Sequence, residues 1–233
     1  MKTLEMLTNF LFPSVCCFCG EITAYDRAVC PRCSRSVTLI SGITCCVCGM
    51  EKGFCDCTEQ APEYKRRLAS FYYEGLPKNG VWLLKYGDIP YIGRIQSAYM
   101  ARQVKTRFHN VSFDMVTAVP MHRLKRRERG YNQAEMLACP LAKRLKLPYY
   151  RDVLIQEREN ATQHLQNRDD RAANVTGIYS LSRKTTVKGK TVLLVDDIST
   201  TGATLRECTR VLLAGGAKEV YCVVFCVTKP INA

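Results

Sequence analysis

The sequence lacks any long hydrophobic run. No stretch approaches the roughly 18 consecutive apolar residues that a membrane-spanning helix needs, so no transmembrane segment is predicted. No export signal is predicted either, because the opening stretch MKTLEMLTNFLFPSVC places Glu5 and Asn9 where a signal peptide would be apolar. This stretch is more typical of an amphipathic helix that Pro13 ends. Both absences favour a cytoplasmic protein.

Acidic residues are scarce relative to basic ones. The chain has 34 Lys and Arg against 21 Asp and Glu, which gives a formal net charge of +13. Cysteine thiolates that hold metal ions would lower this charge but leave the protein basic. A basic chain favours polyanionic partners, such as nucleic acid or phosphorylated metabolites.

Cysteine, in contrast, is abundant, and ten of the 14 cysteines cluster between Cys16 and Cys57. In a reducing compartment such a cluster indicates metal rather than disulfides. The pattern CCFCG at 16–20 returns as CCVCG at 45–49, and each is followed by a second cysteine pair. This duplication is typical of two zinc ribbons, whose four thiolates leave no open position for water and make the metal structural. The predicted ligands are Cys16, Cys19, Cys30, Cys33, Cys45, Cys48, Cys55 and Cys57.

Two features of this framework leave alternatives open. Cys17 and Cys46 are extra thiols that could replace Cys16 and Cys45 as ligands. The pair CDC at 55–57 is shorter than the usual Cys-x-x-Cys, so the prediction is one or two Zn²⁺ ions. A redox or iron–sulfur role is the competing interpretation, which the paired arrangement in two halves disfavours.

From about residue 66 the pattern changes to alternating strands and helices. Strands are predicted at 68–74, 114–120, 152–156, 177–181, 192–195 and 220–227. Helices are predicted at 80–87, 91–108, 132–147 and 202–216. In the third of these, Pro140 must start, kink or end a helix. The alternation predicts an α/β fold with a parallel sheet that binds ligands at the carboxyl ends of its strands. The predicted domains are 1–62, with an N-terminal helix and a double zinc ribbon, and 66–233.

The stretch TVLLVDDISTTGATL at 191–205 carries the chemistry. Its apolar residues lead into Asp196 and Asp197, and burying two adjacent carboxylates is costly unless a ligand completes their surroundings. The residues that follow offer consecutive N–H groups, hydroxyls and the start of a helix, which suit one phosphate. A sugar with a phosphate at one end and a diol beside it satisfies both halves. The nearby GKT at 189–191 is no nucleotide-binding P-loop, because it lacks the upstream glycine and precedes the strand.

VLLVDDISTTGAT resembles the phosphoribosyl pyrophosphate (PRPP) motif of type I phosphoribosyltransferases. Two further segments, 119–137 and 163–179, together with the cysteine-rich head, resemble the competence protein F (ComF) family. The resemblance implies a type I phosphoribosyltransferase fold, a parallel sheet flanked by helices, behind a small double zinc ribbon. It further implies that the catalytic Asp196 and Asp197 hold the ribose hydroxyls, and that Mg²⁺ accompanies the pyrophosphate. The residues that it assigns to PRPP binding are Ser199, Thr200, Thr201, Gly202, Ala203 and Thr204.

Two polar segments complete the site that the resemblance implies. A basic loop between a strand and a helix would bind pyrophosphate, although a solvated basic turn is the alternative. Its candidate residues are Met121, His122, Arg123, Arg129, Asn132 and Gln133. Residues 160–176 resemble a hood over the active site. The candidates there are Gln163, Arg168, Arg171 and Asn174.

The ComF resemblance implies a PRPP-binding protein that handles single-stranded DNA during natural transformation, with DNA-uptake or recombination proteins as partners. The basic charge fits this role, and Tyr131, Tyr149 and Tyr150 could stack on bases or belong to the core. The alternative is an active phosphoribosyltransferase that passes 5-phosphoribose from PRPP to an unidentified amine or base. A third hypothesis is PRPP sensing without turnover. A homodimer is expected, since dimers are common in this fold.

Overall fold

The computed structural model describes residues 14–24, 27–57, 62–158, 177–183 and 185–230. Its centre is a four-stranded sheet with the strand order β1-β6-β5-β2, in which all pairings are parallel. The strands are β1 (Arg66–Tyr72), β2 (Met115–Ala118), β5 (Thr191–Ser199) and β6 (Glu219–Val227). Long buried runs in β5 and β6 follow from their central positions, where both faces of the strand are covered.

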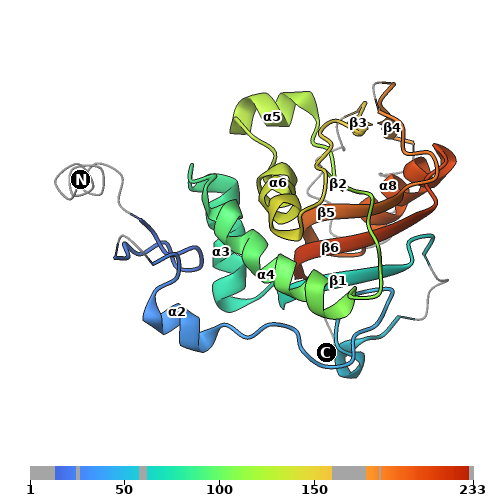
Figure 1. The fold of residues 1–233 in the computed structure, drawn as a ribbon. Helices are drawn as coiled ribbons and strands as arrows, with labels where there is room; N and C mark the ends of the chain where they lie inside the picture. Colours follow the sequence, from blue (N-terminus) through green and yellow to red (C-terminus); the bar gives the residue numbers. More distant parts are fainter. Residues whose placement is uncertain (1–13, 25–26, 58–61, 159–176, 184, 231–233) are drawn as a thin grey trace.

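Helices cover both faces of the sheet (Figure 1). Helices α4 (Ile92–Arg107) and α6 (Gln133–Leu145) pack together on one face, and α8 (Ala203–Ala214) packs on the other. Helix α3 (Gly75–Tyr86) contacts β1 and α4, and the short α5 (Arg123–Arg129) follows β2. The predicted α/β fold with a parallel sheet flanked by helices is therefore confirmed. Among the described helices, none has the length and apolar character needed to cross a membrane.

Helices α4 and α6 approach each other closely at a glycine and a proline. Pro140 lies inside α6 and neither begins nor ends the helix. Because proline has no N–H, it cannot donate to the carbonyl of Met136 one turn earlier. Gly93 of α4 packs against that carbonyl, and a Cβ at Gly93 would lie only 2.6 Å from the Met136 oxygen. Gly93, which has no side chain, therefore allows α4 to approach α6 at the carbonyl that Pro140 leaves without its helical hydrogen bond.

Two predicted strands do not join the parallel sheet, which corrects the simplest interpretation of the alternation. β3 (Leu154–Gln156) and β4 (Tyr179–Leu181) form a separate antiparallel pair. Each has only one fully buried residue, so one side of the pair can face solvent, as is common for antiparallel strands. The buried side packs against α8, where Leu181 meets Gly215 at the end of the helix.

Helix α3 begins earlier than predicted. Gly75, interpreted from the sequence as the stop of a strand, is its first residue, and Pro77 lies in the first turn, where a missing N–H has no cost. The helix then runs without a break to Tyr86, so its last turn, which includes Lys85, lies near the end of the sheet.

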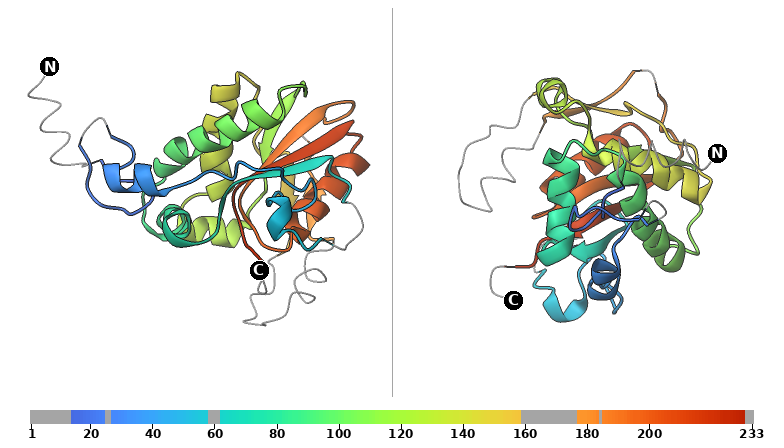
Figure 2. Two further views of the ribbon diagram at one scale, coloured as in Figure 1. Left: turned by 90° about the horizontal axis from the view of Figure 1, so that it is seen from below. Right: turned by 90° about the vertical axis from the view of Figure 1, so that its left-hand side faces the viewer.

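The cysteine-rich head packs against the sheet and helices and shares their core. Its first segment contains α2 (Pro31–Ser36) and its second contains the 3₁₀ turn η1 (Lys52–Phe54), and Figure 2 shows them at separate places on the outside of the fold. Phe18 inserts its ring among Phe71, Tyr99 and Phe225, at centroid distances of 5.6, 5.5 and 6.3 Å. The boundary between domains 1–62 and 66–233 stays a prediction.

Candidate functional site

The acid pair lies inside β5, not after it. The sequence placed the end of this strand at residue 195, whereas hydrogen bonding to β6 continues through Asp196 to Ser199. Asp197 is buried, with 7% of its surface exposed, and Asp196 keeps partial access to solvent. Burial, together with the adjacent charge of Asp197, raises the pKa of Asp196 well above its ordinary value.

Lys85 of α3 completes the surroundings of the acid pair, and nothing in the sequence pointed to it. Its Nζ lies 2.9 Å from Asp197 Oδ2. Burial opposes the charge on Lys85, but the nearby Asp197 carboxylate outweighs it and raises the pKa of Lys85 above its usual value. Lys85 therefore neutralises one of the two acids, which explains how β5 tolerates adjacent carboxylates in the apolar part of the sheet.

The predicted phosphate loop forms a tight turn between β5 and α8. Ser199 is the last residue of β5, and its carbonyl accepts a hydrogen bond from the Thr228 N–H. Gly202 has a φ of +83° and precedes Ala203, the first residue of α8. The first N–H groups of α8 and the hydroxyls of the loop therefore lie at the same end of the sheet as the acids, which is the arrangement that a phosphate requires.

Arg67 of β1 lies directly beneath this loop and is the second residue that the sequence did not reveal. The side chain is buried, and its Nη1 donates to Ser199 Oγ at 2.5 Å. A Cβ at Gly202 would lie 2.5 Å from the same Nη1 atom, so only glycine leaves room for the guanidinium. Because a buried cation costs free energy unless it is paired, this arrangement suits a negatively charged ligand in the loop above.

Arg67 also connects the phosphate loop to the cysteine-rich head. Its backbone N–H donates to the Cys46 carbonyl at 2.8 Å. Gly49 approaches the backbone of β1 so closely that a Cβ there would lie 3.2 Å from the Arg67 carbonyl. The second cysteine turn therefore covers the outer edge of β1 at the residue that supports the loop.

The basic segment is helical, which corrects the prediction of a loop. Arg123–Arg129 forms α5, as its helix-favouring residues allow, and Gly130 ends it with a φ of +81°. Met121 and His122 remain in the connection after β2. His122 is buried, and within the described part of the chain its Nδ1 has no hydrogen-bond partner.

The other candidates of this segment are held by local contacts. Asn132 caps α6, accepting from the Ala134 N–H at 3.0 Å while its amide donates to the Val119 carbonyl at 2.9 Å. Arg129 donates to Gln133 Oε1 at 2.8 Å. These two amide side chains therefore fix the connection between β2 and α6, and Arg123 stays exposed. The hood candidates Gln163, Arg168, Arg171 and Asn174 lie outside the described residues.

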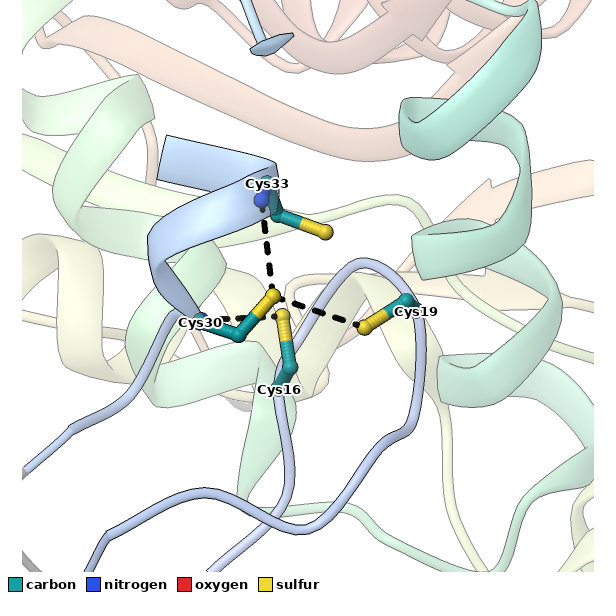
Figure 3. Close-up of side chains that lie close together, drawn as sticks. All are labelled: Cys16, Cys19, Cys30 and Cys33. Atoms are coloured by element: carbon teal, nitrogen blue, oxygen red, sulfur yellow. Dashed lines mark hydrogen bonds between the residues drawn. The ribbon is translucent and has the colours of Figure 1, made fainter. Parts of the chain in front are cut away.

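The first four cysteines form one cluster (Figure 3). The sulfurs of Cys16, Cys19, Cys30 and Cys33 lie within 4.8 Å of one another, and those of Cys19 and Cys30 are 3.8 Å apart. Tetrahedral Zn²⁺ with bonds of about 2.3 Å places its sulfurs about 3.8 Å apart. Burial disfavours the thiolate of Cys16, but backbone N–H donors, including that of Cys30, lower its pKa to about 7. Distances and donors both fit a structural zinc ion.

The remaining four predicted ligands form a second cluster. The sulfurs of Cys45, Cys48, Cys55 and Cys57 also lie within 4.8 Å of one another, so the short CDC pair reaches the site. As in the first cluster, burial opposes the thiolate of Cys45 while backbone N–H groups lower its pKa to about 7. Thiolate sets of this kind suit structural zinc.

The two extra thiols lie outside both clusters. Cys17 is buried, and this burial raises the pKa of its thiol strongly. Its carbonyl oxygen accepts a hydrogen bond from Gln96. Cys46 is exposed. The geometry therefore selects Cys16 and Cys45 over their neighbours.

Comparison with known domains agrees with these two halves. Residues 132–232 match the phosphoribosyl transferase domain, and residues 7–65 match the double zinc ribbon domain. The chain thus carries a segment similar to double zinc ribbons, followed by one similar to phosphoribosyl transferase domains. Among curated proteins it is similar to the DNA utilization protein YhgH of Escherichia coli, with 25% identity over 92% of this chain and 90% of the relative.

Two further relatives confirm the resemblance to the ComF family. Competence protein F of Haemophilus influenzae is 26% identical over 92% of this chain and 96% of its own. Competence protein ComFC of Bacillus subtilis is 25% identical over 82% of this chain and 80% of its own.

Solved structures are more distant. The glutamine PRPP amidotransferase of B. subtilis has 24% identity and a TM-score of 0.39, over 57% of this chain and 26% of that chain. The purine phosphoribosyltransferase of Pyrococcus horikoshii has 17% identity and a TM-score of 0.37, over 57% and 74% of the two chains. Because these scores are low, the domain matches and the strand topology identify the fold.

Proposed function

We propose that this protein binds PRPP at the carboxyl end of β5. The observation that carries the proposal is the junction of an acid pair, of which Asp197 is buried, with a phosphate loop that rests on a buried arginine. Asp196 and Asp197 would accept hydrogen bonds from the ribose hydroxyls, and residues 199–204 would hold the 5′-phosphate above Arg67. A polyanionic ligand would offset the cost of burying the Arg67 guanidinium.

Mg²⁺ is expected to enter with PRPP. The partly accessible Asp196 offers carboxylate oxygens, the ligand type that Mg²⁺ prefers, so the residues present fit the ion. When bound, it would neutralise charge on the pyrophosphate. The pyrophosphate itself would lie towards Met121 and His122, with Arg123 and Arg129 of α5 supplying positive charge and Asn132 and Gln133 fixing the backbone.

We further propose that the PRPP site serves the handling of single-stranded DNA in the cytoplasm. The relatives are named for DNA utilization and competence. A net charge of +13 supports contact with nucleic acid phosphates. The cytoplasm is the compartment in which free thiols persist as metal ligands.

Isothermal titration with Mg²⁺–PRPP tests the first proposal. Wild-type protein should bind, and the Asp197→Asn variant should bind at least tenfold more weakly, because an amide donor replaces one carboxylate oxygen and Lys85 loses the negative charge of its partner. Asp88→Asn is the matched control, since it makes the same chemical change at an exposed residue whose φ of 50° suits asparagine. Equal affinities of wild type and Asp197→Asn would refute the assignment.

The same samples separate binding from transfer. Pyrophosphate release on addition of amines or bases, lost in Asp197→Asn and kept in Asp88→Asn, would make the protein a working transferase. Binding without release across the panel would make it a PRPP-binding protein that acts through its ligand-bound state.

A further inference from the structure

Two large aromatic rings lie exposed on one side of helix α3. Trp82 and Tyr86 are 57% and 58% exposed, and their ring centroids are 5.7 Å apart. They are separated by one helical turn, so they lie on the same face of the helix. Lys78 lies one further turn towards the start of α3 and is exposed as well. We refer to Lys78, Trp82 and Tyr86 as the α3 stripe.

Positive charge continues the stripe onto helix α5. The guanidinium of Arg129 lies 5.1 Å from the centre of the Tyr86 ring, within the range of a cation–π contact. Helix α5 has the sequence RLKRRER, with exposed Arg123 and Arg127 and a single acid, Glu128. Helix α3 itself contains no acidic residue. The contact between Arg129 and Tyr86 therefore joins the exposed rings of α3 to a predominantly basic helix, and Figure 1 shows α3 and α5 near each other.

We propose that the α3 stripe and helix α5 bind single-stranded nucleic acid. Unpaired bases would stack on Trp82 and Tyr86, and the phosphates would contact the arginines of α5 and Lys78. Stacking on aromatic rings accepts every base, because each base has a π-face. A duplex keeps its base faces covered and cannot use exposed rings in this way. The surface therefore fits a single strand without sequence preference.

This inference rests on the proposed role in DNA handling and gives that role a location. Lys85 belongs to the same turn of α3 as Tyr86, and its Nζ contacts Asp197 at 2.9 Å. A strand on the stripe would thus touch the helical turn that also closes the ribose site. Binding at one site would therefore change the affinity of the other, because both sites contact this turn.

The tyrosines that the sequence suggested as stacking residues are less suitable. Tyr131 is partly buried, and its hydroxyl donates to the Leu84 carbonyl at 2.8 Å. Tyr149 is also partly buried. Tyr150 is 36% exposed, with the Lys190 Nζ at 4.7 Å from its ring centre. Tyr150 is therefore a matched control, an accessible ring beside a cation at another place on the surface.

Trp82 reports on the proposed surface directly, because it is the single tryptophan of the chain. The full-length protein would be titrated with a fluorescein-labelled dT oligonucleotide for anisotropy, and with the unlabelled oligonucleotide for tryptophan fluorescence. We expect binding that weakens with salt and is accompanied by quenching of Trp82. Replacing Arg123 and Arg127 by glutamine should reduce the salt slope by about 0.7 for each phosphate that is no longer neutralised.

Variants of the rings separate stacking from charge. Trp82→Ala and Tyr86→Ala should each weaken binding about 5- to 150-fold, the factor that corresponds to ~1–3 kcal/mol per stacked base. Tyr150→Ala should bind like wild type. Binding of Mg²⁺–PRPP to Trp82→Ala, followed by calorimetry without oligonucleotide, verifies that the variant is folded.

The outcomes distinguish this surface from the function on which it rests. If wild-type protein does not bind the oligonucleotide at low salt, both the DNA role and the α3 stripe are wrong. If it binds but Trp82→Ala and Tyr86→Ala bind equally well and the fluorescence is unchanged, the DNA role stands and the location is wrong. A fluorescence change with phosphatidylglycerol vesicles but not with oligonucleotide would overturn the proposal and assign the stripe to a lipid surface.

Discussion

Replacement of Gly202 by alanine should cost more stability than its backbone conformation alone explains. The φ of +83° lies in the left-handed region, where a Cβ costs ~1–2 kcal/mol. The new methyl group would also lie 2.5 Å from Arg67 Nη1, and the guanidinium would have to move away from Ser199. Loss of a buried hydrogen bond from a charged group adds about 1.5–3 kcal/mol. The expected total is about 2.5–5 kcal/mol.

Gly130 provides the control for this prediction. Its φ of +81° is nearly the same, and no atom lies within 4 Å of the position that its Cβ would take. Gly130→Ala should therefore lose only the backbone part, ~1–2 kcal/mol. Urea unfolding of both variants measures the difference. Ribose 5-phosphate binding should fall in Gly202→Ala and persist in Gly130→Ala.

A second comparison shows whether Arg67 is responsible. In an Arg67→Ala background the clash is absent, so adding Gly202→Ala should cost no more than Gly130→Ala does. Equal losses for the two glycine variants in the wild-type background would refute the reasoning, because Arg67 would then not be fixed beneath the loop.

Three further outcomes are expected. Gly93→Ala should lower the unfolding free energy by about 1–3 kcal/mol in urea titrations, because its Cβ would press on the Met136 carbonyl at 2.6 Å; an unchanged midpoint would contradict the close packing. Cys57→Ser should remove one of two zinc ions in elemental analysis while Cys46→Ser keeps both, since only the former lies in a cluster. Asp196→Asn should stabilise the fold at neutral pH. Folding raises the pKa of Asp196, so ionisation of this carboxyl lowers the free energy of unfolding as the pH rises, and asparagine does not ionise. That gain should vanish in urea titrations below the ordinary pKa of aspartate, and an equal gain at both pH values would argue against it.

Residues that are neighbours along the chain could be found from the sequence. The acids and the phosphate loop stand within one short stretch, and the eight cysteine ligands are recognisable by their spacing. The order of types along the stretch, apolar, acidic, hydroxyl and glycine, is the observation on which the prediction of a sugar-phosphate site rested. These features needed no knowledge of the fold.

Lys85 and Arg67 could not be found in this way. One lies on α3 and the other on β1, and both meet their partners only when these elements pack beside β5. In the sequence, Lys85 is one of 34 Lys and Arg residues, and Arg67 stands just before the strand predicted at 68–74. One signal for Arg67 was present in the sequence, since the residues that follow it are apolar. A strand that is covered on both faces of the sheet also buries any charged residue that it contains.

The short strands β3 and β4 show a different limit. Their patterns match those of the strands that entered the parallel sheet, but β3 and β4 pair antiparallel with each other in a separate sheet. In the same way, the sequence of α5 is compatible with a turn or a helix, and its helix-favouring residues decided the outcome.

The place of β1 in the sheet has a consequence for synthesis on the ribosome. Leu68 of β1 pairs with Val223 of β6, so β1 can form its hydrogen bonds to the sheet only after β6, the last strand, has been synthesised. Until then one edge of β1 lacks its neighbour, and unpaired edges of this kind promote association between nascent chains. The other edge meets the Cys46 carbonyl, which is made before β1 itself. A zinc-loaded ribbon can therefore hold this strand in place while the rest of the chain is translated.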